Sequence, residues 1–326
     1  MVNEAALAAR AEAAAREPRG CVAIPTFRRP ESLAALLRGI ARQTRPPAGV
    51  IEVAVFDNDA APTARAAVAA VAPGFPFRLE YVHVAEPGLA SVRNAILAHA
   101  RDRFDYLAMI DDDECPQMQW LVELLRVRVA TGADVVVGPV PPLLPEDAPR
   151  WLRDGRFLEL PTAPDAASID FAYSGNCLLD VAAVERRAVV FDRALDFAGG
   201  EDLLFFRTLL ARGARFAFAA RAVAFETLGP ERLRANYVLA LNFRRGNTLA
   251  QCDRRVMPSF AGGARRAAKA CGRIALGALT LLPLSLVRGR RGALDALCSI
   301  ARGLGALCGL AGHTHQAYRR DHADAR

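Results

Sequence analysis

Short apolar runs alternate with amphipathic segments between residues 20 and 140. Runs of β-branched and aliphatic residues predict buried strands, and apolar residues three and four positions apart predict helices. The predicted strands cover residues 21–25, 51–56, 79–84, 106–110 and 134–137, and the predicted helices between them include 32–42 and 89–101. This alternation is typical of an α/β fold with a mainly parallel sheet, in which ligands bind beyond the carboxyl ends of the strands.

The pattern changes after residue 138. Residues 138–165 are rich in proline and show no period, so they predict a long excursion over the surface. Loops of that length in a compact domain usually serve function. The pattern then predicts a strand near 171–179, a helix over 201–211 and another helix over 233–245.

The last part of the chain is both apolar and basic. Residues 254–326 hold 13 of the 42 Lys and Arg residues but only 3 of the 35 Asp and Glu residues. The uncharged stretch 274–287 has 14 residues, short of the roughly 20 that a spanning helix needs. The sequence therefore predicts helices that lie on or re-enter a membrane, flanked by arginines that meet anionic headgroups. A pair of ordinary core helices is the alternative.

Composition narrows the function classes. The body of the chain is slightly acidic, which argues against a nucleic-acid partner. Seven cysteines with no CxxC pair fit neither a disulfide framework nor a zinc ribbon, so we expect a reducing, cytoplasmic compartment. The first twenty residues interleave charges with alanines and lack the apolar core of a signal peptide.

The sharpest chemical signal is Asp111-Asp112-Asp113-Glu114, directly after the apolar run 106–110. Carboxylates gathered at the end of a buried strand repel one another unless a cation or hydrogen bonds offset their charge. A hard divalent ion such as Mg²⁺ or Mn²⁺ would do so and would keep positions for phosphate oxygens. An acidic turn in solvent is the alternative.

Two further acidic motifs follow or precede predicted elements. Asp57 comes after a strand, where a carboxylate can accept a hydrogen bond from a nucleobase or a ribose. Glu201 and Asp202 open a helix, whose dipole favours the ionised form that a general base requires. Each motif taken alone is equally consistent with a turn residue or with ordinary helix-terminal charge.

A glycine turn opens the helix that carries Arg93, a guanidinium that can pair with a diphosphate or form a surface salt bridge.

Several other enzyme classes lack support. The chain has no GxGxxG after its first strand, no P-loop, no HExxH and no GxSxG.

Taken together, six motifs stand in the order and approximate spacing of the family 2 glycosyltransferases, over about residues 20–250. They are AIPTFRR (23–29), DND (57–59), GLASVRN (88–94), DDDE (111–114), SGN (174–176) and GGED (199–202). The chain most resembles the bacterial members that build exopolysaccharide repeats on a lipid carrier, whose C-terminal regions lead into apolar helices.

This resemblance implies a GT-A fold, a nucleotide-diphospho-sugar donor, bound Mn²⁺ or Mg²⁺ and inversion at the anomeric carbon. By motif, Asp202 matches the general base, with Glu201 and Asn176 on the acceptor side. The donor-binding positions are Pro25, Thr26, Arg28, Asp57, Arg93, Asp111 and Asp112. The metal positions are Asp113, Asp111 and, where some relatives have a histidine, Glu226.

The resemblance also implies an organisation. We expect a polar helix or flexible segment over 1–19, a GT-A domain over 20–250 and a basic, apolar, membrane-associating tail over 251–326. The implied enzyme moves a sugar to a lipid-linked or saccharide acceptor in cell-surface polysaccharide synthesis, on the cytoplasmic side of the inner membrane. The rival interpretations are a sugar nucleotidyltransferase and a non-catalytic, membrane-bound nucleotide-sugar-binding protein.

Overall fold

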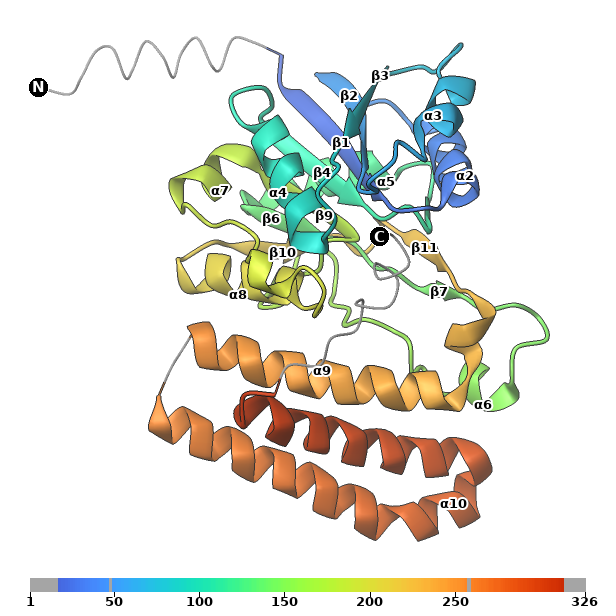
Figure 1. The fold of residues 1–326 in the computed structure, drawn as a ribbon, viewed down its shortest axis with the longest axis vertical. Coiled ribbons are helices and arrows are strands. Elements are labelled where there is room, and N and C mark those ends of the chain that lie inside the picture. The colour runs from blue at the N-terminus through green and yellow to red at the C-terminus, as the bar shows by residue number, and fades with distance from the viewer. Residues whose placement is uncertain (1–16, 47–48, 257–258, 314–326) are drawn as a thin grey trace, which may run out of the picture.

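An α/β body stands on a layer of long helices in the computed structural model, which describes residues 17–46, 49–256 and 259–313 (Figure 1). Most of the expected N-terminal segment 1–19 lies outside the described residues. The strands are β1 (Arg19–Thr26), β2 (Val50–Asp57), β3 (Arg78–His83), β4 (Tyr106–Ile110), β5 (Glu114–Pro116), β6 (Val135–Val137), β7 (Pro142–Leu143), β8 (Ser168–Ile169), β9 (Asn176–Asp180), β10 (Phe216–Phe218) and β11 (Ala224–Thr227).

Nine α-helices and two short 3₁₀ turns complete the described part of the chain. They are α2 (Pro30–Ala41), α3 (Arg65–Val71), α4 (Leu89–Ala100), α5 (Trp120–Thr131), α6 (Arg150–Arg153), α7 (Val181–Arg186), η1 (Arg193–Leu195), α8 (Glu201–Ala211), η2 (Pro230–Leu233), α9 (Ala235–Val256) and α10 (Phe260–Leu310).

The main sheet has the strand order β3-β2-β1-β4-β9-β6-β10-β8. Strands β3, β2, β1 and β4 are parallel, as expected, but β9 runs antiparallel between β4 and β6. The carboxyl ends of β1, β2 and β4 therefore share one edge with the start of β9. A smaller sheet, β5-β11-β7, lies beside that edge and brings residue 226 next to residue 114.

Alternate residues of β1 belong to two apolar cores, one on each face of the sheet. Cys21 and Ala23 pack with α4, α7 and α8, whereas Val22 and Ile24 pack with α2, α3 and α5. Both faces of the sheet are covered by helices, as the buried parallel strands require.

The Pro-rich segment differs from its prediction as a surface excursion. It contains β7 and α6, and several of its large apolar side chains are buried, although Leu143 is 46% exposed. Trp151, Leu152 and Phe157 form a third apolar cluster with Val238 of α9 and Leu294 of α10. This cluster joins the α/β body to the helical layer.

Helix α10 is two antiparallel segments joined at Gly289, whose φ of 57° and ψ of −141° break the helix. We call residues 260–288 the outer segment and residues 290–310 the inner segment. The inner segment lies between α9 and the outer segment (Figure 1). Helix α9 itself runs unbroken across residue 250, where we expected the catalytic domain to end.

Candidate active site

The carboxylates that follow β4 have different surroundings. Asp112 is buried and anchors the loop after β1: its Oδ2 accepts a 2.8 Å hydrogen bond from the Thr26 hydroxyl, and its Oδ1 accepts one of 3.1 Å from Arg29. Asp113 is less buried, and its Oδ2 accepts a 2.9 Å bond from the same Arg29 guanidinium. The acidic loop and the first loop of the sheet are therefore one unit.

The Asp111 carboxylate lies beside Arg93 of α4, with 3.9 Å between its Oδ1 and the Arg93 Nη2. Burial raises the pKa of Asp111 to about 7, although the positive charge of Arg93 acts to lower it. Asp113, Asp112 and Glu226 raise it further. A cation bound among these carboxylates would offset the repulsion between their negative charges.

Glu114 is the most confined member of the cluster. It is 6% exposed, and burial followed by the charge of Asp111 raises its pKa well above the usual value. Its Oε2 is buried and has no hydrogen-bond partner among the residues that the structure describes. A buried carboxyl oxygen of this kind calls for a proton or a cation.

Glu226 reaches the same cluster from β11, because β11 pairs with β5. Its Oε1 forms an ion pair with Arg232, at 2.7 Å from the Arg232 Nη1. The same Nη1 lies 4.0 Å from Oδ2 of Asp113. Arg232 therefore competes with a metal for Glu226. The expected metal role of Glu226 has no geometric support beyond this proximity.

Arg93 connects the acidic loop to the helix that carries the predicted base. Both Arg93 and Glu201 are buried, at 7% and 2% exposure, and they form a close ion pair. The guanidinium also stacks over the Phe191 ring at 5.9 Å. In this structure the Arg93 guanidinium pairs with Glu201 and lies near Asp111, and Glu201 holds Arg93 in place. The diphosphate contact of Arg93 and the acceptor contact of Glu201 stay predictions.

Asp202 is the carboxylate of this pair that remains partly exposed. Two glycines in the left-handed region, Gly199 with φ 76° and Gly200 with φ 91°, turn the chain into α8 and set Asp202 in its first turn. Its Oδ1 accepts a 2.7 Å bond from the Leu203 N–H. No ion pair neutralises Asp202 within the described part of the chain, so it is available as a base.

Two predicted contact residues, Asp57 and Arg28, already bind partners within the protein. Asp57 is 0% exposed, and its Oδ2 accepts bonds from the Ala64 N–H at 2.7 Å and the Tyr81 hydroxyl at 2.8 Å. These bonds hold the turn after β2 and leave Asp57 no open face toward a nucleobase. Arg28 forms an ion pair with the buried Asp59, at 2.8 Å between the Arg28 Nε and the Asp59 Oδ2.

Asn176 is also structural. It is 0% exposed, its Nδ2 donates to the carbonyl oxygens of Pro139 at 3.0 Å and Ala222 at 2.8 Å, and its Oδ1 accepts from the Trp120 indole at 2.7 Å. The amide ties three segments together around the end of β9. The position of Asn176 on the acceptor side stays a prediction, and its side chain is enclosed by the protein in this structure.

The acidic loop fits a divalent ion by its donor chemistry. Asp111 and Asp113 offer hard carboxylate oxygens, which Mg²⁺ and Mn²⁺ prefer, and the orphaned oxygen of Glu114 lies beside them. The described residues contain no preformed group of three His, Cys, Asp or Glu ligands. Phosphate oxygens and water would therefore complete the coordination.

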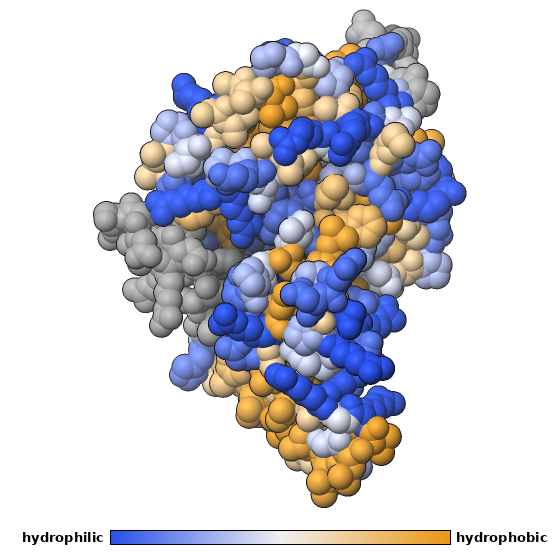
Figure 2. Space-filling view, turned by 90° about the vertical axis from the view of Figure 1, so that its right-hand side faces the viewer, coloured by the Kyte–Doolittle hydropathy of each residue, from blue (hydrophilic) through white to orange (hydrophobic). Residues whose placement is uncertain are grey.

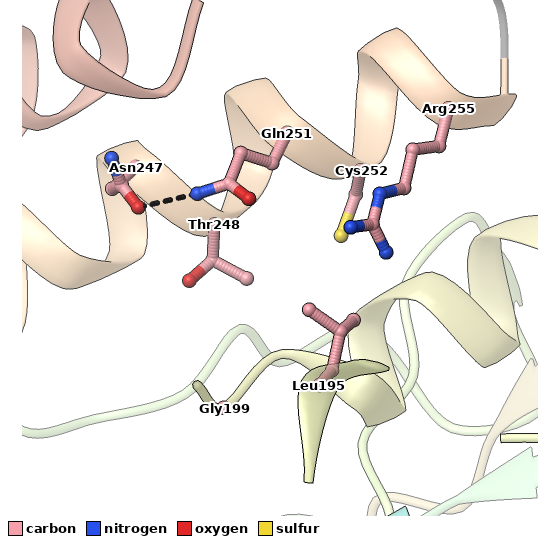
Figure 3. A pocket seen from close by; sticks show the side chains of 7 residues that line it. All are labelled: Leu195, Gly199, Asn247, Thr248, Gln251, Cys252 and Arg255. Atoms are coloured by element: carbon pink, nitrogen blue, oxygen red, sulfur yellow. Dashed lines mark hydrogen bonds between the residues drawn. The ribbon is translucent and has the colours of Figure 1, made fainter. Parts of the chain in front are cut away.

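A small cavity of about 10 Å³, room for about one water molecule, lies between the 195–199 segment and α9 (Figure 3). It abuts the helix of Asp202, because the Cys252 thiol lies 3.8 Å from the carbonyl oxygen of Gly200. In Figure 3 Thr248, Cys252 and Arg255 point from α9 toward the 195–199 segment. The cavity is lined by Leu195, Gly199, Asn247, Thr248, Gln251, Cys252 and Arg255.

The sequence reasoning did not single out Arg29 or Arg232 as site residues. Arg29 was visible as the second arginine of the AIPTFRR motif, and the acidic run supplies the charge that it meets. Arg232 had no signal, because only the pairing of β11 with β5 brings it to the cluster.

A family model described as "Glycosyl transferase family 2" matches residues 21–187. The succinoglycan biosynthesis protein ExoM of Rhizobium meliloti (strain 1021) is 35% identical over 227 residues, which cover 70% of this chain and 72% of ExoM. The chain belongs to glycosyltransferase family 2. The matched region of this family member includes the first loop, the acidic loop and Arg93.

Solved structures confirm the GT-A fold. The mannosyltransferase PcManGT from Pyrobaculum calidifontis, in complex with GDP-Man and Mn²⁺, aligns with a TM-score of 0.60 at 19% identity, over 91% of this chain and 88% of that one. Residues 1–349 of S. aureus TarS, in complex with UDP-GlcNAc, align with a TM-score of 0.51 at 16% identity, over 90% and 92%. At these identities the likeness concerns the fold alone.

Proposed function

We propose that this family 2 glycosyltransferase moves a sugar from a nucleotide-diphospho-sugar to a hydroxyl of a lipid-linked or saccharide acceptor, with inversion, during cell-surface polysaccharide synthesis. The observation that carries the proposal is the Arg93 bridge. It connects the acidic loop after β4 to the Glu201-Asp202 helix, although the two lie about ninety residues apart in the sequence. ExoM, named for succinoglycan biosynthesis, supports the polysaccharide context.

The donor side of the proposed site is the acidic loop. Asp111 and Asp113 would hold Mn²⁺ or Mg²⁺, and the ion supplies positive charge that offsets the charge developing on the departing nucleoside diphosphate. Thr26 and Arg29 fix the loop through Asp112. The GDP-Man and UDP-GlcNAc complexes of the structural relatives support a nucleotide-sugar donor.

The acceptor side is the start of α8. The partly exposed Asp202 carboxylate, in the first turn of α8, removes the proton from the attacking hydroxyl. Its neighbour Glu201 is occupied by Arg93, so the two acids divide into one base and one positioning residue.

The experiment that tests this function starts from a donor screen, in which sugar-nucleotide hydrolysis with manganese identifies the donor. In Asp202→Asn we expect unchanged donor affinity and a transfer rate lower by about 10²-fold or more, because the amide cannot accept the proton. The amide oxygen can still accept the Leu203 N–H bond, so the fold is kept.

The matched control is Asp102→Asn, an exposed aspartate in the turn before β4, at the opposite edge of the sheet. It should leave the transfer rate unchanged. Turnover of Asp202→Asn at the wild-type rate would remove Asp202 from the mechanism.

We also propose that the protein works on the cytoplasmic face of the inner membrane. Among the described residues, α10 is the one helix long and apolar enough to cross a membrane, and only 11% of its most apolar window is buried. The outer segment leaves Leu279, Leu282 and Leu286 exposed by 77%, 69% and 78%. Figure 2 shows hydrophobic surface gathered at the lower end of the molecule, which is the end that α10 occupies in Figure 1.

A further inference from the structure

One guanidinium stands between carboxylates of two different segments. The Arg232 Nη1 lies 2.7 Å from Oε1 of Glu226, on β11, and 4.0 Å from Oδ2 of Asp113, in the acidic loop. The side chains of Arg232, Glu226 and Asp113 are exposed by only 23%, 20% and 19%. A partly buried cation therefore offsets the charge of both acids, in a place where salt screens the interaction little.

The carboxylates come together without help from Arg232. Strand β11 pairs with β5 and places Glu226 opposite Glu114, and the Thr227 N–H donates a 2.8 Å hydrogen bond to the carbonyl oxygen of Asp113. Backbone hydrogen bonds thus hold Glu226 beside the acidic loop. Because like charges held together repel one another, the cluster needs a positive charge to offset them.

Arg232 is held less firmly than the two acids. It belongs to the 3₁₀ turn η2, in which no residue is buried. Its guanidinium stacks over the Tyr237 ring at 5.6 Å, and its Nε is buried without a hydrogen-bond partner among the residues that the structure describes. Movement of this side chain would open the Nε to water and would disturb no buried residue of η2.

Arg29, the other arginine at Asp113, has a second partner. Its Nη1 lies 2.9 Å from Oδ2 of Asp113 and 3.1 Å from Oδ1 of Asp112, which the Thr26 hydroxyl holds in place. An ion that binds Asp113 leaves Arg29 paired with Asp112. Within the described ranges Arg232 has no such alternative, since Asp113 is a proposed metal ligand and Glu226 lies beside it.

We propose that Arg232 is the counter-ion of the metal-free carboxylate cluster, and that a divalent ion bound at Asp113 displaces it. The proposal rests on the metal site of the proposed function and adds a positioning residue that regulates this site. The ion and the guanidinium compete for the same negative charge, so Arg232 lowers the affinity for the ion. The carboxylates stay neutralised when no ion is bound.

The test measures Mn²⁺ binding to the full-length protein in a neutral detergent by electron paramagnetic resonance, which reports free Mn²⁺ and needs neither donor nor turnover. Arg232→Gln should bind Mn²⁺ about tenfold more tightly than the wild type, the scale of one charge-assisted pair that no longer competes. Arg232→Lys keeps the charge and should stay closer to the wild type. The gain should disappear in Arg232→Gln/Asp113→Ala, which would locate it at the acidic loop.

Arg234→Gln is the matched control, because Arg234 is an exposed arginine two positions further along the chain. It removes the same charge from the same segment and should change the Mn²⁺ affinity by less than about twofold, since solvent and salt screen an exposed charge. Unchanged or weaker Mn²⁺ binding in a folded Arg232→Gln variant would overturn the proposal, as would an equal gain in Arg234→Gln. If unfolding curves show that Arg232→Gln does not fold, Arg232→Met, which keeps an apolar contact with Tyr237, takes its place with the same expectation.

The result is independent of the test of the proposed function. A protein whose Mn²⁺ affinity depends on Arg232, but which transfers no sugar, would contradict that function and leave this proposal standing. An active transferase whose Mn²⁺ affinity does not depend on Arg232 would overturn this proposal alone.

Discussion

Four consecutive carboxylates after β4 meet four different environments. Asp112 and Glu114 are buried, whereas Asp111 and Asp113 are partly exposed. Asp112 holds the first loop through Thr26, Asp111 faces Arg93, and Asp113 meets Arg29. The run therefore combines structural residues with candidate ligands, and only the partly exposed positions should affect the metal directly.

Asp113→Ala tests that distinction. We expect loss of manganese-dependent donor binding, by about tenfold or more, because the substitution removes a carboxylate ligand and frees Arg29 to pair with Asp112 alone. Calorimetric titration of the donor with and without manganese measures the effect.

Glu185→Ala is the control, since Glu185 lies on α7 at the far edge of the sheet and pairs only with Arg101 among the described residues. It should keep the manganese effect. Undiminished, metal-dependent donor affinity in Asp113→Ala would assign the ion to other ligands.

At the residue scale, the sequence located the acids but not their partners. Asp57 and Asn176 stand where the motifs predict, next to the carboxyl edge of the sheet. Their side chains are nevertheless hydrogen-bonded within the protein, Asp57 to Ala64 and Tyr81, and Asn176 to Trp120 and a backbone carbonyl. Hydrogen bonds between segments far apart in the chain leave no local pattern, so the direction in which a polar side chain points could not be predicted.

At the scale of elements, the contact between α9 and the inner segment of α10 depends on close backbone approach. A Cβ on Gly246 would overlap the Arg302 carbonyl oxygen, and one on Gly305 would overlap that of Phe243. Small residues at such crossings let two helices touch over a long stretch. This contact fixes α9 and the inner segment of α10 to one another.

Two glycine-to-alanine substitutions should have opposite effects on stability. Gly246→Ala should destabilise the protein by about 1–3 kcal/mol, because backbone must move to admit the methyl group. Gly272→Ala, with no atom within 4 Å of the added Cβ, should stabilise α10 by about 0.5–1 kcal/mol through helix propensity. Urea unfolding of both variants gives the comparison, and equal shifts would contradict the packing.

The sequence predicted elements best where one strong pattern decides them. The strand over 106–110 and the helix over 201–211 have the predicted bounds. The strand expected near 171–179 begins only at Asn176, and its antiparallel direction depends on pairing with β4 and β6. The two apolar runs of the tail were visible, but their packing on α9 was not.

On the scale of the whole molecule, one end is apolar and the other carries the candidate active site. The outer segment of α10 presents a row of leucines, while its inner side packs on the inner segment. Arginines 288, 290 and 291 stand at the turn between the segments. An apolar face bordered by cations is suited to the headgroup region of an anionic membrane.

A Leu279→Gln/Leu282→Gln/Leu286→Gln variant should fold normally and lose binding to phosphatidylglycerol-containing vesicles, because its changes fall on exposed side chains. Vesicle sedimentation measures the loss. This design is safer than deletion of the tail, which would strip the inner segment from the third apolar cluster and expose Val238.

Val129→Gln serves as the control, since Val129 is 78% exposed on α5 of the catalytic body. It should sediment with vesicles like the wild type. If the leucine variant also sediments unchanged, the outer segment does not contact lipid.

The unbroken course of α9 has a practical consequence for exchanging parts between relatives. Its first turns pack in the third apolar cluster, its later turns face the 195–199 segment, and its opposite side carries α10. A chimera joined near residue 250 would splice two unrelated half-helices within one continuous helix. A junction between β11 and Ala235 would instead transplant α9 and α10 as one unit.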